Sequence, residues 1–547
     1  MLRKEFGFTL SAREMVDYPS LRSQARILES KSGHAQTTDA QAATVREPLS
    51  LEAIQLAVHP EDAKSFQEKA SAAVSKSGFD FDQDVDTVIQ ASDFTNVLIR
   101  HKIMDTWNFG IAIVANGSTV PFLRQALVAA LSQSPLWTSF YVLGEDGAPF
   151  YVTMKPQQKL WDHCTSFAGS VETFAELQHK AIRYPHPEHA THPGLLFHAL
   201  LYHVEELNSA AFVMYLHHSV HDASSMRLVL EDLNKALSAP ERPLQPHVPF
   251  KTWADIYHSL RNSPRATIEV DWHVKRLSNL HLHRKALYPP AKVPRQATTA
   301  DPDGLDYGFD APQLLNLKKH HPQTTASVVL KAAMALVNIT RTQHTHALFS
   351  NFEAARSTLP FWPDTLSPLS TTNTTSLSDV DASDVAGPTM NAVTNLIPIH
   401  RSESALALLT RLQTEQLQLT KHAHAPWRRI MSALDALHPG ENAGDILPET
   451  HQTQFLTWVP GFLGDYERIR VAQIAIRAAL GLVFVAGLGG ERATTYMISL
   501  RWDVANYSRE ETEAFVGDVE KAVMWLLEER NWGREVGGFL DGIVDGR

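Results

Sequence analysis

Cysteine is almost absent from this sequence, in which Cys164 is the one thiol among 547 residues. A single cysteine cannot form an internal disulfide, so we expect the chain to work in a reducing, cytoplasmic compartment. Cys164 could act as a nucleophile, but no catalytic motif surrounds it. The favoured interpretation is a small residue buried in a core.

Positive charge and long apolar runs are also in short supply. The chain has 49 Lys and Arg against 60 Asp and Glu, which gives a formal net charge of −11. This balance argues against broad binding of nucleic acid or of an anionic membrane, because both need a basic face. The most apolar stretch, residues 478–490, is too short to span a bilayer and predicts a buried strand. No apolar core typical of a secretory signal follows Met1.

Several familiar signatures of catalysis and metal binding are missing. Gly-x-Ser-x-Gly and His-Glu-x-x-His do not occur, so serine-hydrolase and zinc-protease functions have no support. Residues 186–192 hold three closely spaced histidines, but the prolines around them favour a solvated linker. The alternating aspartates of residues 80–86 lack the glycine and the closing glutamate of an EF-hand, and they predict a solvated turn. We therefore expect no metal site.

The length of the chain predicts two domains of similar size or one large bilobal unit. Residues 1–30 are typical of helices, and residues 31–80 of a linker with an N-terminal extension. Residues 81–250 alternate strands and helices. A proline-bounded segment at 243–249 separates them from residues 251–547, which form the second half.

A histidine pair stands out in the first half. Two long apolar runs, residues 195–204 and 210–218, predict an antiparallel strand pair, and the second run leads into His-His-Ser-Val-His-Asp at residues 217–222. Neighbouring side chains of a strand point to opposite faces, so one histidine faces the lobe core and the other a different space. A histidine at a strand end suits a general base, because its pKa lies near the working pH.

The segment 217–222 resembles the central motif of nonribosomal peptide synthetase condensation domains, with Ala223 where that family usually has glycine. Four further segments agree with the family in the correct order, so that the resemblance covers about residues 80–535. Residues 84–94 resemble the opening segment of fungal members, 249–255 the segment before the lobe crossover, 351–356 the Arg motif, and 385–391 the Gly-Pro-x-x-Asn motif. Residues 6–21 look like the last helices of a carrier domain, without its phosphopantetheine serine.

The resemblance implies an α/β (α+β) fold of two chloramphenicol-acetyltransferase-like lobes. They form a V-shaped pseudo-dimer with the active site in a tunnel at their junction. The implied reaction is condensation, in which a carrier-bound acyl or peptidyl thioester is transferred to an amine or hydroxyl acceptor. Such reactions build secondary metabolites, among them siderophores and cyclic peptides, and terminal fungal members can also cyclise or oligomerise their product.

The resemblance also implies partners and site residues. The substrates would be carried on the phosphopantetheine of separate or upstream carrier domains, and the acceptor would be a small molecule or a peptidyl group. No cofactor is expected to be bound covalently to this chain. His218 would act as the base or would position the acceptor nucleophile, and Asp222 would pair with Arg356. The candidate residues are His218, His217 and Asp222 for catalysis, Arg356 and Ala223 for support of the site, and Asn391 and Trp458 for substrate binding.

Three other functions stay open. A free-standing acyltransferase that uses coenzyme A would share the His-x-x-x-Asp pattern. An epimerase relative shares the histidine motif, but the Glu-Gly-His-Gly-Arg signature associated with it is absent. A non-catalytic docking module would keep the histidine pair without using it.

Overall fold

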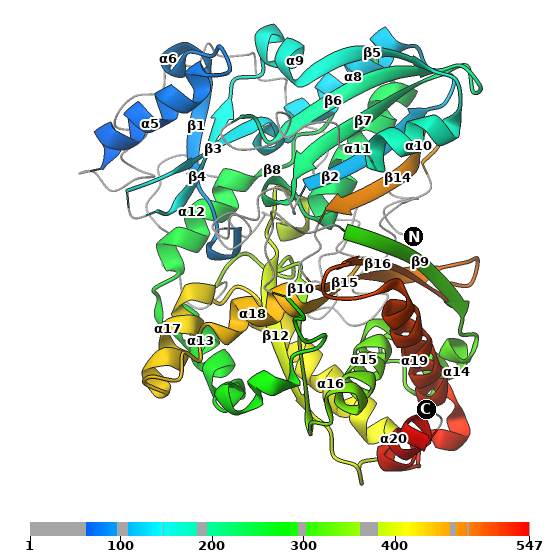
Figure 1. Cartoon of the computed structure of the whole chain (residues 1–547). Helices are drawn as coiled ribbons and strands as arrows, with labels where there is room; N and C mark the ends of the chain where they lie inside the picture. Colours follow the sequence, from blue (N-terminus) through cyan, green and yellow to red (C-terminus); the bar gives the residue numbers. More distant parts are fainter. Residues whose placement is uncertain are drawn as a thin grey trace, which may run out of the picture.

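The computed structural model describes residues 62–95, 108–145, 147–182, 194–293, 302–361, 381–459, 466–477 and 481–545. The predictions for residues 1–30 and 186–192 lie outside the described residues, as do those for most of residues 31–80. The described chain has two lobes of mixed α/β structure, each built on its own large sheet (Figure 1).

The N-terminal lobe is built on a five-stranded sheet in the order β14-β2-β7-β6-β5. Its strands are β2 (Asn108–Ala115), β5 (Thr165–Val171), β6 (Phe197–Val204), β7 (Ser209–His217) and β14 (Ile469–Arg477). β6 and β7 are antiparallel, which confirms the predicted strand pair. Every residue of β7 is buried, because α8 (Val120–Ser132) packs against one face of the sheet and α10 (Phe174–Ile182) against the other.

A smaller sheet lies beside it, in the order β1-β4-β3. Its strands are β1 (Val85–Gln90), β3 (Ser139–Leu143) and β4 (Pro149–Met154), with α5 (Ala63–Ser75) packed against β3. β4 pairs antiparallel with both neighbours and all its residues are buried. The smaller sheet reaches the turn after β7 through Tyr151 of β4, whose hydroxyl donates to the Ser219 carbonyl.

The acidic segment before β1 corrects one prediction. Instead of a solvated turn, Phe81–Asp84 form the short helix α6, whose N-cap is Asp80. Asp84 is buried, and its two carboxylate oxygens accept hydrogen bonds from Lys159 Nζ and Gln157 Nε2, each at 2.6 Å. Burial alone would raise the pKa of this carboxyl, but the hydrogen bonds bring it below its ordinary value.

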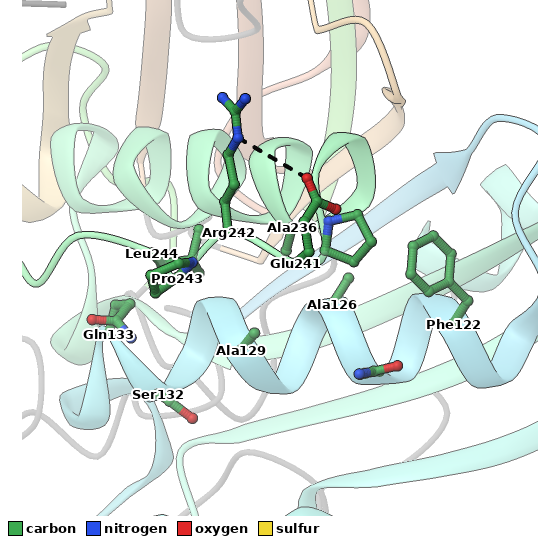
Figure 2. Close-up of a pocket in the computed structure, with 12 residues that line it drawn as sticks. Phe122, Ala126, Ala129, Ser132, Gln133, Ala236, Glu241, Arg242, Pro243 and Leu244 are labelled. Carbon is green, nitrogen blue, oxygen red and sulfur yellow. Dashed lines mark ion pairs between the residues drawn. The ribbon is translucent and has the colours of Figure 1, made fainter. Parts of the chain in front are cut away.

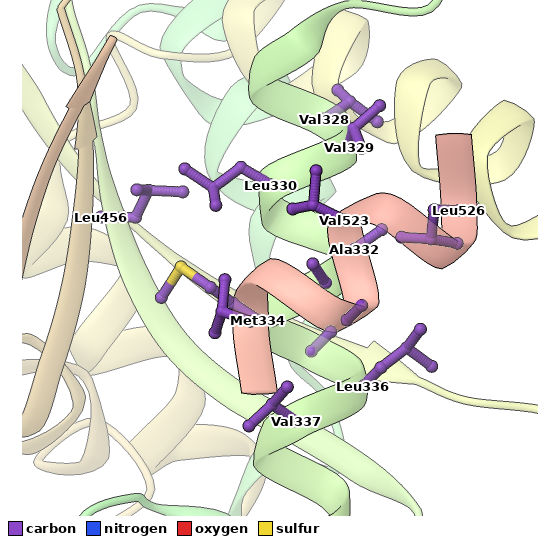
Figure 3. Close-up of a cluster of buried hydrophobic side chains, with 14 of the residues drawn as sticks. Val328, Val329, Leu330, Ala332, Met334, Leu336, Val337, Leu456, Val523 and Leu526 are labelled. Atoms are coloured by element: carbon purple, nitrogen blue, oxygen red, sulfur yellow. The ribbon is translucent and has the colours of Figure 1, made fainter. Parts of the chain in front are cut away.

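The C-terminal lobe is built on a six-stranded sheet in the order β12-β10-β13-β15-β16-β9. Its strands are β9 (Pro302–Asp310), β10 (His346–Glu353), β12 (Asn391–Pro398), β13 (Gln454–Trp458), β15 (Leu482–Gly489) and β16 (Thr495–Asp503). The strand predicted within residues 478–490 is confirmed as β15. Figure 3 shows the apolar side chains by which α15 (Ala326–Thr342) and α19 (Arg509–Leu527) pack in the core of this lobe. Thr325 caps α15, because its side chain accepts a hydrogen bond from the Val328 N–H.

Strand β14 crosses between the lobes. It comes from the second half of the chain, yet it pairs with β2 of the N-terminal sheet, from Ile469↔Ala115 to Arg477↔Asn108. Ile469 is buried in the N-terminal core. A second link is the parallel pair of β8 (Val248–Pro249) and β11 (Val385–Ala386). The lobe boundary at residue 250 stays a prediction. It assigns β14 to the C-terminal lobe, although β14 pairs with the sheet of the N-terminal lobe.

The remaining helices surround these sheets. They are α9 (Gln158–Cys164), α11 (Ala223–Ser238), α12 (Phe250–Leu260), α13 (Pro264–Arg276), α14 (Gln313–His320), α16 (Ala405–Lys421), α17 (Trp427–Leu437), α18 (Ile446–Thr453) and α20 (Val536–Asp545). Cys164, at the end of α9, is fully buried, which confirms the favoured interpretation, and burial raises the pKa of its thiol to about 12. Among the helices of the described residues, none combines the length and apolar character that crossing a membrane requires.

Candidate active site

The histidine motif forms the turn between β7 and α11. The strand ends at His217, and a short 3₁₀ turn, η3 (His218–Val220), leads to Asp222 at the N-cap of the helix. Asp222 Oδ1 accepts a hydrogen bond from the Ser225 backbone N–H at 2.8 Å, and the Ser225 hydroxyl accepts one from the Asp222 N–H at 2.9 Å. This reciprocal capping box fixes the start of the helix. Ala223 is its first residue.

His217 lies entirely inside the N-terminal lobe. Its side chain has no exposed surface, and its Nδ1 accepts a hydrogen bond from the Ser219 backbone N–H at 3.1 Å. The imidazole therefore caps the turn that follows. A buried ring in this position can support the site, but it has no surface to offer an incoming acceptor.

His218 lies where the two lobes meet. Its ring contacts Phe109 of β2, with centroids 4.9 Å apart, and Phe352 of β10 in the other lobe, with centroids 5.8 Å apart. His218 Nδ1 lies 3.0 Å from the His221 carbonyl oxygen. A carbonyl oxygen only accepts hydrogen bonds, so the proton of the neutral ring is on Nδ1 and the lone pair is on Nε2.

Burial also sets the charge of His218. Only 8% of the residue is exposed. Burial lowers the pKa of the imidazole below its ordinary value, although the hydrogen bonds to the His221 carbonyl and to the backbone of His218 itself, together with the charge of Asp222, oppose this. The ring is therefore neutral at neutral pH, the state that a general base needs.

Asp222 and Arg356 form the ion pair that the resemblance implies. Arg356 Nη2 donates to both carboxylate oxygens, at 2.9 and 3.0 Å, and each side chain is only 6% exposed. Oδ2 also accepts a hydrogen bond from the Thr389 N–H at 3.1 Å. With these bonds and the one from Ser225, the carboxylate is committed to structure and not to proton transfer.

Arg356 extends this network into the C-terminal lobe. Its Nη1 donates to the Val385 carbonyl at 2.8 Å, and its Nη2 to the Gly387 carbonyl. Ala355 adopts a left-handed conformation, with φ of +50°, as the chain leaves β10 and turns toward the other lobe. At Gly387, an added Cβ would lie 2.5 Å from the ring of Phe250, so only glycine allows this close approach.

The two substrate-binding candidates have other contacts. Asn391 Nδ2 donates to the carbonyls of Ala423 and Ala425, both at 3.0 Å, and this joins β12 to the segment before α17. Trp458 is half-buried at the end of β13, with its ring centroid 6.2 Å from that of Tyr496. These contacts account for both residues as packing, and their role in substrate binding stays a prediction.

Sequence reasoning missed several residues that hold the turn. The Tyr151 hydroxyl, from β4 of the small sheet, donates to the Ser219 carbonyl and is fully buried. Thr389 approaches Asp222 through its backbone, which leaves no trace in the side-chain pattern. Asp222 could have been found as an N-cap, because aspartate is preferred there, but Ser225 stands where a capping box usually has Glu or Gln and gives no such signal.

A groove of about 430 Å³ lies elsewhere on the N-terminal lobe, between α8 and the segment after α11 (Figure 2). Its lining is Phe122, Gln125, Ala126, Ala129, Ser132, Gln133, Ala236, Pro240, Glu241, Arg242, Pro243 and Leu244, with none of the motif residues among them.

Across the described ranges, no three His, Cys, Asp or Glu side chains are arranged to hold a metal ion.

Comparison with known proteins gives a likeness of structure and not of sequence. No family model matches the chain, and no curated protein matches its sequence. The first condensation domain of the calcium-dependent antibiotic synthetase, solved with a substrate analogue, has a TM-score of 0.62 at 13% identity over 83% of this chain and 99% of that one. The epimerization domain from the third module of tyrocidine synthetase B has a TM-score of 0.58 at 13% identity over 81% of this chain and 98% of that one.

A third similar structure is the X-domain in complex with OxyB from teicoplanin biosynthesis. Its TM-score is 0.61 at 12% identity, over 81% of this chain and 94% of that one. Identities this low establish the fold alone. The chain therefore has the fold of condensation domains, a mixed α/β structure of two chloramphenicol-acetyltransferase-like lobes, as the sequence resemblance implies.

Proposed function

We propose that this protein is an acyltransferase that condenses a carrier-bound acyl or peptidyl thioester with an amine or hydroxyl acceptor in nonribosomal peptide biosynthesis. The observation that carries the proposal is the state of His218 at the lobe junction: buried, with its proton on Nδ1 and its lone pair on Nε2. A neutral imidazole held in this way can accept a proton from an incoming nucleophile.

In the proposed reaction, His218 carries a proton from the acceptor to the sulfur of the donor. The acceptor nitrogen or oxygen attacks the thioester carbonyl carbon while His218 Nε2 takes its proton. The new C–N or C–O bond forms and the C–S bond breaks. The proton then passes from the imidazolium to the departing sulfur, so the donor arm leaves as a free thiol and His218 returns to its starting state. Holding donor and acceptor together at the junction supplies a further part of the rate.

The other site residues support His218 in this proposal. His217, Asp222, Ala223 and Arg356 build and fix the turn that presents the ring, while Asn391 and Trp458 are kept as candidates for contact with substrate. The phosphopantetheine arms belong to partner carrier domains, and no cofactor is bound covalently here. A fungal type, a carrier-like tail at residues 1–30, a cytoplasmic location and a cyclised product belong to the same proposal.

Mass spectrometry of products tests the proposal directly. Acyl groups loaded on carrier domains are mixed with the protein and with candidate amines and alcohols, and His218→Ala is compared with the wild type. Loss of a positioned base should lower turnover by about 10²–10⁴-fold. The matched control is His320→Ala, because His320 also begins a His-His pair but lies exposed at the end of α14. That variant should keep wild-type turnover.

Three results would contradict the proposal. Equal turnover by His218→Ala and the wild type would remove His218 from the reaction, and a complete lack of product would favour a docking role instead. Equal use of the same acyl group on coenzyme A and on a carrier would favour the free-standing acyltransferase.

A further inference from the structure

We infer that His221, the last histidine of the motif, is a positioning residue that holds the ring and the tautomer of His218. The inference rests on the proposed function for its catalytic consequence, but its contacts are independent of that function. His221 occupies one of the three positions between the histidine pair and Asp222, and nothing in the pattern of the motif assigns it a role.

His221 contacts His218 in two ways at once. The rings are stacked, with centroids 4.8 Å apart and planes 29° from parallel. The backbone carbonyl of the same residue accepts the Nδ1–H of His218 at 3.0 Å. One residue thus supports the plane of the ring from its face and sets the position of its proton from its edge.

The side chain of His221 is itself fixed. Its Nδ1 donates to the His217 carbonyl at 3.2 Å, which closes the turn and aims the His221 carbonyl at His218. Phe109 meets the His221 ring edge-on at 4.8 Å, and Trp137 lies 5.9 Å away. Only 2% of His221 is exposed, so its neighbours hold the imidazole ring in place.

The surroundings keep the His221 imidazole uncharged. Burial and the neighbouring imidazoles of His218 and His217 lower the pKa of His221 well below its ordinary value. Asp222, which is paired with Arg356, is the nearby acid of the turn. The side chains that β2, η2 (Pro135–Thr138) and β10 place against the two rings are Phe109, Trp137 and Phe352, none of which titrates.

The stack has a direct chemical consequence. A neutral, buried ring against the face of His218 excludes water there, and exclusion of water disfavours the imidazolium form. The carbonyl contact disfavours the tautomer with the proton on Nε2, which would offer no lone pair at that nitrogen. His221 therefore keeps Nε2 ready to accept a proton at a pH where a solvated histidine is already protonated.

Two substitutions separate the ring from the hydrogen bond. His221→Asn keeps an N–H donor near the position of Nδ1 and removes the stacked ring. His221→Phe keeps a stacked ring and removes the donor that closes the turn. We expect the first to move the acidic limb of kcat/KM to higher pH, and the second to lower kcat by about tenfold or more at nearly unchanged KM, because a small misplacement of a catalytic group is costly.

A spectroscopic measurement gives a readout without turnover. The ¹⁵N shifts of the His218 ring, assigned by their loss in His218→Ala, report its tautomer and its pKa. In the wild type they should show the proton on Nδ1 and a lowered pKa. The pKa should rise toward its ordinary value in His221→Asn, and the tautomers should mix in His221→Phe, while His320→Asn leaves both unchanged.

Two outcomes of these measurements distinguish failure of the inference from failure of the proposed function. If the His218 shifts and pKa match the wild type in both His221 variants, the inference is overturned, even where activity falls together with the melting temperature. If the shifts change as expected but no condensation product forms with any variant or with the wild type, the inference stands and the proposed function fails.

Discussion

Arg356 shows how much of the site depends on one side chain. It neutralises Asp222, binds two carbonyls of the segment 385–387, and lies almost wholly out of contact with water. The guanidinium fork suits this arrangement, because it offers several donors in one plane to a carboxylate and to carbonyls together. A lysine could not replace these contacts with its single nitrogen.

We predict that Arg356→Ala lowers the free energy of unfolding by about 3–5 kcal/mol, because the charge of Asp222 is left buried without a partner. Chemical denaturation measures the change. The matched control is Lys251→Ala, whose ion pair with Asp255 joins side chains that are 42% and 58% exposed, and its loss should cost about 1 kcal/mol or less. Similar losses in the two variants would contradict the structural role given to Arg356.

At the scale of elements, the contact between β11 and α12 depends on the absence of a side chain at Gly387. We predict that Gly387→Ala destabilises the protein by about 1–3 kcal/mol, because its Cβ would overlap the Phe250 ring. Phe250→Leu in the same chain should recover part of the loss, and a double-mutant cycle measures this coupling. Additive losses would mean that the two residues do not interact.

The control is another glycine with space around it. Gly517 lies within α19, and an added Cβ there meets nothing within 4 Å. Gly517→Ala should therefore stabilise the protein by about 0.5–1 kcal/mol, because alanine loses less backbone entropy in a helix. Opposite signs at the two glycines would identify crowding, and not the substitution itself, as the cause.

His247 joins elements of both halves of the chain. Its Nε2 lies 2.7 Å from Asp232 of α11, and its Nδ1 lies 3.2 Å from Asp384, just before β11. Lys235 also binds Asp232. Burial would lower the pKa of His247, but the two carboxylates outweigh it and raise the pKa to about 9. The protonated ring therefore links the helix after the histidine motif to the segment that binds Arg356.

The raised pKa of His247 predicts a loss of stability in alkali. Its stabilising contribution is fully present below the ordinary histidine pKa of about 6.5 and disappears as the pH rises through about 9. The melting temperature of His247→Gln should lie below that of the wild type at pH 7, and the difference should shrink by pH 10. A difference that stays constant over this range would show that the ring acts by packing and not by charge.

At the scale of the whole molecule, the sequence predicts the elements better than their partners. The strand pair 195–204 and 210–218 and the strand within 478–490 follow from local patterns, and both are present. The pairing of β14 with β2 does not follow from any local pattern, because strand partners are chosen by tertiary packing. The solvated turn predicted around Asp84 was wrong for the same reason, since Lys159, which binds the buried Asp84 carboxylate, is distant in sequence.

The residues of the candidate site could also be predicted from the sequence, but not all the contacts between them. The motif at 217–222 and Arg356 are recognisable from residue types and their order. The stacking of His221 on His218 is not, because it depends on how the chain turns after the strand ends.

The two-lobed architecture predicts how a shortened chain behaves. A fragment of residues 62–250 retains β2 but lacks β14, so that it exposes the unpaired edge of β2. We expect this fragment to aggregate and to unfold without cooperativity, and to become soluble when residues 251–547 are expressed beside it. Size-exclusion chromatography and circular dichroism measure both effects. A monomeric fragment with a sharp melting transition would contradict the need for β14.

The same strand exchange affects the order of events on the ribosome. The chain is made from its N-terminus, so β2 emerges long before β14 has been translated. Until then one edge of the N-terminal sheet is open, and a nascent chain with an open edge can pair with a neighbouring nascent chain. The N-terminal sheet, whose synthesis begins first, therefore stays incomplete until β14 of the second half has been translated, and chaperones have the whole of that interval in which to act.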